Sequence, residues 1–465
     1  MRVKVQLVIE SENHVSQTAE IASVERGELN TGSIGFHVSE MKSIVEGLQQ
    51  SMVTAQVEEF FKASRQCPVC GGRLKRKGRH TIVYRTVFGK LRLESPRLYP
   101  CQSCTSHRHS FSPLAERLPH RSSPELQYLQ TKFAALMSYG LTVNLLSEVL
   151  PLDETLSVTS IRRCANRISD RLEQGGIKPD TEPMSTNAVN DYIPQPSSVK
   201  AIGIDGGYIR LAGRKSRQDG WFEVMVGKSQ RRDSHGCCFA YVHRLEPDPT
   251  KRMRDFLDHE GVRPDQPVLF LSDGGDTVRQ AQAGYGRFGE SILDWFHISM
   301  RIQNLLQLAK GLEQTEDTPQ REAILTDIER VKWYLWNGCS YRALRRLESL
   351  AWDIEAFNDS ETTKKLANKL KESITYFSRN RNYIVNYGDR FRHGDPIATG
   401  FVESAVNQVV SKRFSKKQQM SWSDRNAHRL LQVRVAVLNS ELRSHFERWY
   451  PELAANDNDM VQQAA

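Results

Sequence analysis

The sequence Val-Lys-Ala-Ile-Gly-Ile-Asp-Gly-Gly, residues 199–207, decides the fold class of this chain. A short apolar run broken by Asp-Gly-Gly is typical of a buried strand whose carboxylate, here that of Asp205, emerges at the strand's end. Residues 268–275, Val-Leu-Phe-Leu-Ser-Asp-Gly-Gly, repeat the pattern around Asp273. An Asp before Gly-Gly is also a common turn residue, so each stretch taken alone has that simpler interpretation.

The surrounding sequence predicts strands and helices in a definite order. Strands are expected at residues 199–204, 221–227, 237–242, 268–271 and 292–296, and helices at 252–259 and 277–283. Three successive strands, then strands alternating with helices, predict an α/β domain with a mixed sheet. This is the element order of the ribonuclease H-like fold. We therefore predict such a catalytic domain from residues 199–298 and 396–445, interrupted by an all-helical insertion at 299–395.

A third carboxylate, that of Glu403, lies in the helix-like run Phe-Val-Glu-Ser-Ala-Val-Asn-Gln-Val-Val, residues 401–410. Two strand ends and a helix carboxylate can hold two divalent cations, Mg²⁺ or Mn²⁺. Paired cations about 3.5–4 Å apart activate a nucleophile and stabilise the leaving oxygen of a phosphodiester, which indicates phosphoryl transfer. Asp276 competes with Asp273 for the second position, but the strand ending at Ser272 favours Asp273.

Four cysteines form two pairs, and their spacing is typical of metal ligands. The segment Cys-Pro-Val-Cys supplies Cys67 and Cys70, and Cys-Gln-Ser-Cys supplies Cys101 and Cys104. The β-branched and aromatic residues between the pairs predict a hairpin that brings them together. Four thiolates at this spacing fit a structural Zn²⁺ site, so we predict a zinc ribbon at residues 63–120. His107 and His109 are alternative ligands that the sequence makes less favourable.

Positive charge is concentrated in two windows of a chain whose formal net charge is +9. Residues 62–97 hold eleven Lys or Arg against one acid, and residues 412–434 hold seven against one. Such windows are often solvated faces, but one beside a cysteine motif and one beside Glu403 favour nucleic acid as a partner. The predicted DNA contacts in these windows are Lys75, Arg76, Lys77, Lys412, Arg413, Lys416 and Lys417.

Residues 121–174 show helical periodicity, and the first helix is expected to stop at Gly140. This pattern indicates a helix-turn-helix-like DNA-binding segment that presents Arg162 and Arg163. An ordinary three-helix packing unit is the alternative.

The remaining segments are a strand and helix at 1–62, a linker at 175–198 and a flexible tail at 446–465. No apolar stretch approaches about 18 residues, so we expect no membrane segment and a cytoplasmic protein.

Several of these motifs together resemble bacterial insertion-sequence transposases of the ISKra group. The segments are those around Asp205 and Asp273, Ile-Leu-Asp-Trp-Phe-His at residues 292–297, and the long block around Glu403, which is the most specific. The resemblance runs from the cysteine motif to about residue 440. It implies a DDE-type transposase in which the three acids form the metal-binding triad. Asp294 and His297 match the family's Asp-x-x-His element, so His297 is a further catalytic candidate, and Asp294 and Asn407 would support the triad. Asp294 and His297 could orient a ligand carboxylate, coordinate metal or shuttle a proton, whereas a packed histidine at a helix start is the simpler interpretation of His297.

The expected function is a transposase that binds the terminal inverted repeats of a mobile element in double-stranded DNA. It would cleave phosphodiester bonds with Mg²⁺ or Mn²⁺ and join the 3′-OH ends to target DNA, as a homodimer or higher oligomer on DNA. One alternative is a ribonuclease H-like nuclease that cuts without joining. Another is a zinc-ribbon regulator with an inert catalytic half, which is disfavoured because an inert domain need not retain all three acids.

Overall fold

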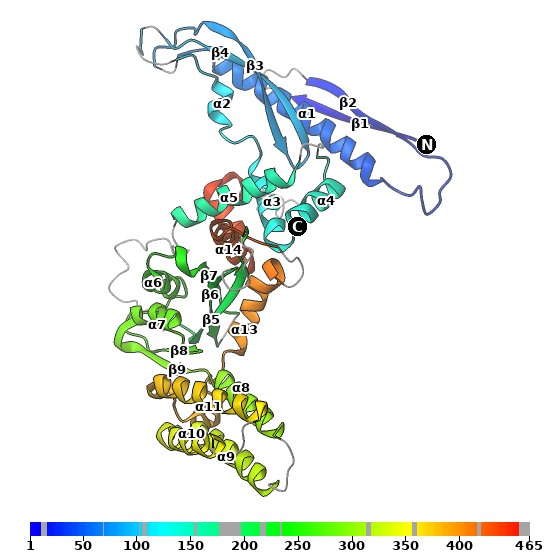
Figure 1. Ribbon diagram of the computed structural model, residues 1–465. Helices are drawn as coiled ribbons and strands as arrows, with labels where there is room; N and C mark the ends of the chain where they lie inside the picture. Colours follow the sequence, from blue (N-terminus) through cyan, green and yellow to red (C-terminus); the bar gives the residue numbers. More distant parts are fainter. Residues whose placement is uncertain are drawn as a thin grey trace. The chain divides into compact units, whose positions relative to one another are not determined.

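The computed structural model divides into two compact units, Met1–Ile168 with Glu441–Ala465, and Ser169–Ser440 (Figure 1). It describes residues 1–10, 16–67, 69–101, 103–104, 109–152, 156–175, 197–213, 220–232, 235–312, 318–355, 360–415 and 420–454. His107, Lys416, Lys417, most of the predicted linker and the end of the predicted tail lie outside these residues. Among the described residues, no helix combines the length and apolar character needed to cross a membrane.

The first unit begins with two antiparallel hairpins packed on one long helix. Its elements are β1 (Arg2–Glu10), β2 (Ser16–Glu25), α1 (Val38–Ala63), β3 (Arg76–Thr86) and β4 (Gly89–Leu98). Alternating side chains of the second hairpin, such as Ile82, Leu91 and Leu93, are buried against apolar residues of α1. The predicted hairpin between the cysteine pairs is therefore present, since β3 pairs with β4 over their whole length.

Short helices complete this unit: α2 (Pro113–Arg117), α3 (Pro124–Leu136), α4 (Tyr139–Val149), the first part of α5 (Val158–Gly175) and α15 (Leu442–Trp449). Ser123 and Ser138 accept a backbone N–H bond at the start of α3 and α4, as N-cap residues do. Gly140 was expected to stop a helix, but it lies inside α4 because the Ser138 cap starts a new helix before it.

The second unit contains a mixed five-stranded sheet in the order β7-β6-β5-β8-β9. The strands are β5 (Val199–Arg210), β6 (Trp221–Arg231), β7 (Cys238–Val242), β8 (Val268–Ser272) and β9 (Gly289–Leu293). The first three strands pair antiparallel, whereas β8 and β9 run parallel to β5. The chain is thus α/β, as its sequence predicts.

Helices cover both faces of this sheet (Figure 1). On one face, α6 (Pro249–His259) and α7 (Asp276–Gln282) bury Met253, Phe256 and Val278 against β5 and β8. The other face carries α13 (Gly400–Val406) and the π-helix η4 (Asn407–Ser415). Helix α14 (Asp424–Leu438) packs along β7, the edge strand of the sheet. His428 of α14 accepts a hydrogen bond from the backbone N–H of Val242 in β7, at 3.2 Å.

Strand boundaries around the aspartates differ from the sequence-based prediction. Strand β5 continues through Asp205 to Arg210, because β6 pairs with it along this whole length. Asp205 therefore lies within a strand and not at its end. Strand β9 ends at Leu293, since Asp294 caps the helix that follows.

Between β9 and α13 the described chain is helical. Its elements are α8 (Trp295–Lys310), α9 (Thr318–Trp336), α10 (Ser340–Glu355), α11 (Glu361–Asn380) and α12 (Tyr387–Arg392). They share an apolar core that includes Leu305, Leu347 and Phe377 and that reaches Leu293 of the sheet. Figure 1 shows α8 to α11 gathered beside β9, so this helical part lies next to the carboxyl ends of the parallel strands.

Candidate functional site

Aspartates occupy equivalent register positions on the three parallel strands, inside β5 and directly after the ends of β8 and β9. Ser272, the last residue of β8, is in register with Ile204 of β5 and Leu293 of β9. Each of these residues is followed in the sequence by an aspartate, namely Asp205, Asp273 and Asp294. Because neighbouring strands lie about 4.8 Å apart, this register places the aspartates in one row. The structure thus brings Asp205 and Asp273 to adjacent positions.

The covering helix α13 approaches β5 on both sides of Asp205. A Cβ atom at Gly203 would lie 2.8 Å from Phe401 Cζ, and one at Gly207 would lie 3.3 Å from Val406 Cγ1. Side chains two residues apart on a strand share a face, so Asp205 faces α13 between these two glycines. The glycines permit this close approach because they lack side chains. Glu403 lies on α13 within the same stretch of contact.

The carboxylates of Asp205, Asp273 and Glu403 do not form one compact cluster. Within the described chain, Asp205, Asp273 and Glu403 are not among the clusters whose ligand atoms all lie within 4.8 Å of one another. Asp205 and Asp273 are half-buried, while Glu403 is exposed. Two ions about 3.5–4 Å apart need ligands that are spread over both ions, which one compact cluster does not supply. The arrangement therefore provides two adjacent carboxylates and a third on the helix above them.

The electrostatics around Asp205 favour a bound cation. Burial raises the pKa of its carboxyl group, and the negative charges of Asp273 and Asp294 raise it further. The backbone N–H of Gly206, which donates to Asp205 Oδ1 at 2.8 Å, and the charge of His297 lower the pKa in part. Clustered carboxylates are costly to ionise together, and a divalent cation removes that cost. Hard oxygen donors suit Mg²⁺ or Mn²⁺.

Asp294 ties the helical part to the helix that carries Glu403. It is completely buried, and its Oδ1 accepts the backbone N–H groups of Phe296 at 2.8 Å and Thr399 at 3.2 Å. Its Oδ2 accepts the Thr399 hydroxyl and lies 2.9 Å from His297 Nδ1. Since both oxygens are occupied, Asp294 positions α8 and the start of α13, and it orients the His297 ring.

His297 is half-buried at the first turn of α8. Its hydrogen bond to Asp294 raises the pKa of the imidazole, and burial opposes this effect. The charges of Asp294, Asp205 and Asp273 raise the pKa further. His297 is therefore electrostatically coupled to the aspartate row, and it is not a histidine packed away from it.

Asn407, predicted to support the triad, begins the π-helix η4 four residues after Glu403. A π-helix leaves backbone carbonyls outside the usual bonding pattern, and such segments are common at functional sites. Here the buried Arg434 Nε donates to the carbonyl oxygens of Gln408 at 3.1 Å and Val409 at 2.8 Å. The hydrogen bonds from Arg434 of α14 thereby hold the backbone that follows Glu403 and Asn407 in place.

The predicted DNA contacts separate into exposed and buried residues. Lys75, Arg76 and Lys77 are exposed at the start of β3, Arg162 and Arg163 are exposed on α5, and Lys412 is exposed on η4. Arg413 corrects the prediction, because it is only 1% exposed and its guanidinium lies 5.2 Å from the centroid of the Trp422 ring. Charge counting could not distinguish Arg413 from its neighbour Lys412. Arg413 is therefore a core residue and not a DNA contact.

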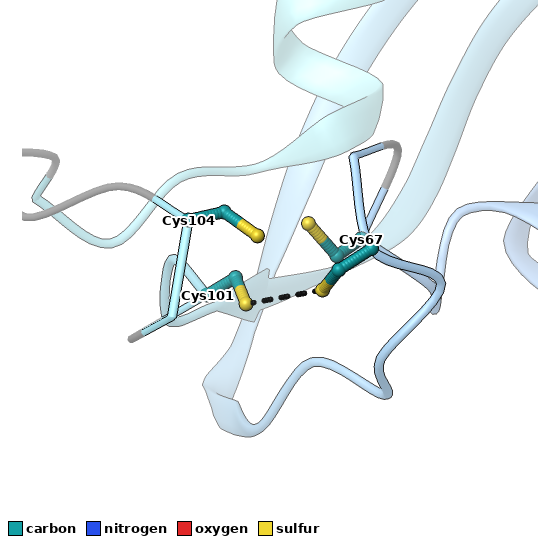
Figure 2. Close-up of side chains that lie close together, drawn as sticks. Cys67, Cys101 and Cys104 are labelled. Atoms are coloured by element: carbon teal, nitrogen blue, oxygen red, sulfur yellow. Dashed lines mark hydrogen bonds between the residues drawn. The ribbon is translucent and has the colours of Figure 1, made fainter.

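The four cysteines meet in the first unit. The sulfur atoms of Cys67, Cys70, Cys101 and Cys104 all lie within 4.8 Å of one another. Figure 2 shows the side chains of Cys67, Cys101 and Cys104 converging, and Cys70 Sγ lies 3.6 Å from Cys101 Sγ. Zn–S bonds of about 2.3 Å in a tetrahedron place sulfurs about 3.8 Å apart, so this cluster could hold a metal such as zinc.

The thiols of this cluster shift the pKa values of Cys101 and Cys104. A backbone hydrogen bond from Ser103 and a contact with Cys70 lower the pKa of Cys101 to about 7. The neighbouring Cys70 sulfur raises the pKa of Cys104 to about 12. Without a cation the four thiols cannot all ionise, whereas a bound metal deprotonates them together. His109 is exposed and belongs to no metal-binding cluster among the described residues.

A cleft of about 860 Å³ lies beside Asp273, and no sequence pattern predicted it. Tyr376 of α11 lines it and donates its hydroxyl to the backbone oxygen of Asp273, at 2.8 Å. Burial raises the pKa of Tyr376 to about 12, so the hydroxyl remains a donor at neutral pH. The helical sequence of α11 shows a polar face, but it does not show which part of the sheet this face meets.

No family model matches the chain, and no curated protein matches it. The assignment of function therefore depends on the geometry and chemistry of the aspartate row, α13 and the cysteine cluster.

Proposed function

We propose that this protein is a metal-dependent DNA transposase of the DDE type with a ribonuclease H-like catalytic domain. The observation that carries the proposal is the register that sets Asp205 beside Asp273, with Glu403 on the helix packed against the same strand. The sheet order β7-β6-β5-β8-β9, with only β8 and β9 parallel to β5, supports the proposed fold. Phosphodiester chemistry is the reaction class that paired metal-binding carboxylates serve best.

Each residue of the site has a proposed role. Asp205, Asp273 and Glu403 would hold two Mg²⁺ or Mn²⁺ ions, which activate a nucleophile and neutralise charge on the phosphate. Asp294 holds the His297 ring through Nδ1, so Nε2 remains for proton exchange with the attacking water or 3′-OH. Water would be the nucleophile for cutting, and the 3′-OH would be the nucleophile for joining.

The first unit would recognise DNA. A Zn²⁺ ion on the four cysteines would fix the base of the β3–β4 hairpin, whose exposed Lys75, Arg76 and Lys77 would contact phosphates. Helices α3 to α5 would act as a helix-turn-helix-like reader with Arg162 and Arg163 exposed. We propose double-stranded element ends and target DNA as partners, bound by a homodimer or higher oligomer.

The test is DNA cleavage and strand transfer by charge-removing variants. Asp205→Asn, Asp273→Asn and Glu403→Gln should each reduce cleavage by a factor of about 10³ or more, because ligands that act as a unit fail together. DNA binding should persist. The exposed Asp276, three residues beyond Asp273, provides the matched control, so Asp276→Asn should retain most activity.

Other results of this test would contradict the mechanism or indicate one of the alternative functions. Full cleavage by Asp205→Asn would contradict the mechanism. Cleavage without any joined product would identify a nuclease, and DNA binding without any cleavage by the wild-type chain would identify a regulator.

A further inference from the structure

Helix α1 carries an apolar stripe that the described part of the chain leaves only partly covered. Its members repeat at alternating spacings of three and four residues, which is the spacing of a coiled-coil seam. None of them is buried, and Met52 is 55% exposed. The stripe consists of Val38, Met41, Val45, Leu48, Met52 and Ala55. A continuous apolar row of this kind on a folded chain marks a surface that a protein partner covers.

The other apolar faces of α1 already have contacts inside the first unit. Ile44 is buried, and a Cβ atom at Gly47 would lie 2.7 Å from Ile21 of β2. On a further face, Val53 and Val57 pack against the core of the β3–β4 hairpin. The helix is therefore apolar on more sides than its own hairpins cover, which is typical of a helix that is buried all round.

Strand β1 lies beside the stripe and has a free edge. Figure 1 shows the β1–β2 hairpin lying along α1. Leu7 and Ile9 of β1 line a cleft of about 530 Å³ together with Leu48 and Met52 of the stripe. Within the described chain, β1 pairs only with β2. A two-stranded sheet is only marginally stable alone, and an unpaired edge is a template for another strand.

The free edge of β1 presents a regular row of backbone groups. The amino group and the carbonyl oxygen of Met1 bond to the backbone of Arg26 of the neighbouring strand, at 2.8 Å each. Because direction alternates along a strand, the backbone groups of even-numbered residues from Arg2 to Glu10 point outward. The bulge in this hairpin falls at Ile21 of β2 and leaves β1 regular.

The cations of β1 do not guard this edge. Long charged side chains on an edge strand usually prevent another strand from pairing there. Here Lys4 pairs across the hairpin with Glu20 at 2.8 Å, and Arg2 Nε donates to Ser23 Oγ at 2.9 Å. Both side chains are thus directed toward β2, and the outer edge stays open.

The surface formed by β1 is complementary to itself. Antiparallel pairing of β1 with β1 of a second copy, centred on Gln6, sets Arg2 opposite the exposed Glu10 of that copy. Opposite charges at such positions stabilise strand pairing. The apolar residues on the α1 side then meet only one another; these are Val3, Val5, Leu7 and Ile9.

The same two-fold axis makes the two α1 helices antiparallel. Because Leu7 shares its cleft with Leu48 and Met52, an axis at the neighbouring Gln6 passes close to the middle of the stripe. The two stripes can therefore pack against each other, with the side chains of one fitting between those of the other.

We propose that β1 and the stripe of α1 form the interface between two copies of this chain. The two hairpins join into one four-stranded sheet, and the two stripes pack against each other beneath it. The inference goes beyond the proposed function and does not depend on it, because neither DNA nor a metal takes part. A second copy is the partner because the charges and apolar residues of β1 match those of β1 itself in the register centred on Gln6.

The test is the oligomeric state of the full-length protein without DNA or divalent metal, measured by sedimentation equilibrium. Wild-type protein at micromolar concentrations should have twice the mass of one chain. Met52→Glu should weaken this association about 100-fold, because it buries a carboxylate without a partner. Gln50→Glu is the matched control, since it adds the same charge at an exposed position on another face of α1. Val8→Pro should weaken association about tenfold, because it removes an outward N–H from each copy and keeps the bonds to β2.

A crosslink tests the register. Cysteines at position 6 of the two copies would face each other with Cα atoms about 5.5 Å apart, which suits a disulfide. Gln6→Cys should therefore give a covalent dimer on mild oxidation, beyond any formed by wild type. Lys4→Cys is the control, because its two copies would lie about 13 Å apart along the strands. Crosslinking of Lys4→Cys in place of Gln6→Cys would contradict the register.

Thermal melting separates loss of the dimer from loss of folding. The melting temperature of wild type should rise with protein concentration, whereas that of Met52→Glu should not, although the variant still unfolds cooperatively. A monomeric wild-type protein, or wild-type association in Met52→Glu, would overturn the proposal. A wild-type protein that dimerises but does not cleave DNA would contradict the proposed function and support this inference.

Discussion

At the scale of single residues, the aspartates in the row differ because their surroundings differ. Asp294 is fully buried and saturated by donors from Phe296, Thr399 and His297, so it acts as a structural anchor. Asp205 accepts the N–H of Gly206 and remains half-buried, with a raised pKa. A cation adds little stabilisation to a carboxylate whose oxygens already accept several hydrogen bonds. It adds much more to a carboxylate that has few donors and little positive charge beside it. This contrast favours the proposed metal-binding role for Asp205 and a positioning role for Asp294.

The pKa of His297 should report whether cations bind beside it. In the metal-free protein its imidazole should titrate above the ordinary value of about 6.5, because Asp294 and the other aspartates stabilise the imidazolium. Its contribution to stability is then fully present below about pH 6.5 and is lost as the pH rises through the folded-state pKa. Added Mg²⁺ should lower this pKa, since it neutralises Asp205 and Asp273. Proton NMR of the imidazole, assigned with His297→Gln, provides the measurement.

The matched variant for this titration is Asp205→Asn. It should lower the metal-free pKa of His297 and reduce the effect of Mg²⁺. A pKa that stays unchanged on adding saturating Mg²⁺ would contradict the metal site, even if the enzyme proved active.

At the scale of elements, the packing of α13 against β5 depends on the absence of a side chain at Gly203. Gly203→Ala would bring a Cβ to 2.8 Å from Phe401 Cζ and 3.0 Å from Val402 Cβ, so α13 must move. Overpacking of this kind costs about 1–3 kcal/mol. We expect a loss of that size in urea denaturation, together with reduced cleavage because Glu403 moves with its helix.

Gly400→Ala is the control on the same helix, because nothing lies within 4 Å of a Cβ at that position. It should be neutral or slightly stabilising. Equal stability of the two alanine variants would show that the close approach of α13 is not required.

The sequence predicts where the strands of this region lie, but it does not predict how far they extend or which distant residues contact them. Apolar runs and Asp-Gly-Gly located β5 and β8, since strand burial leaves a local pattern. They did not reveal that β5 continues beyond Asp205, because that depends on pairing with β6 far along the chain. The burial of Arg413 beneath Trp422 and the contact of Tyr376 with Asp273 are equally non-local. Local patterns therefore identified the candidate ligands but not the groups that hold them.

At the scale of the whole molecule, the two proposed metal sites belong to different compact units. The cysteine cluster lies in the first unit, and the aspartate row lies in the second. Each unit has its own apolar core, one between α1 and the β3–β4 hairpin and another around the mixed sheet. Loss of one site should therefore leave the other unit folded, and this separation makes the roles of the two sites distinguishable.

Removal of the cysteine-bound metal should impair the first unit selectively. Wild-type protein should contain about one equivalent of zinc, and Cys101→Ser should lose it, because three thiolates hold zinc much more weakly than four. Hydrogen exchange should then accelerate in β3 and β4 but not in β5 or β8, and DNA binding should weaken. Cys339→Ser is the control, since Cys339 lies in the helical part and belongs to no metal-binding cluster among the described residues. Full zinc content in Cys101→Ser, or faster exchange in β5 and β8 as well, would contradict a structural zinc site confined to the first unit.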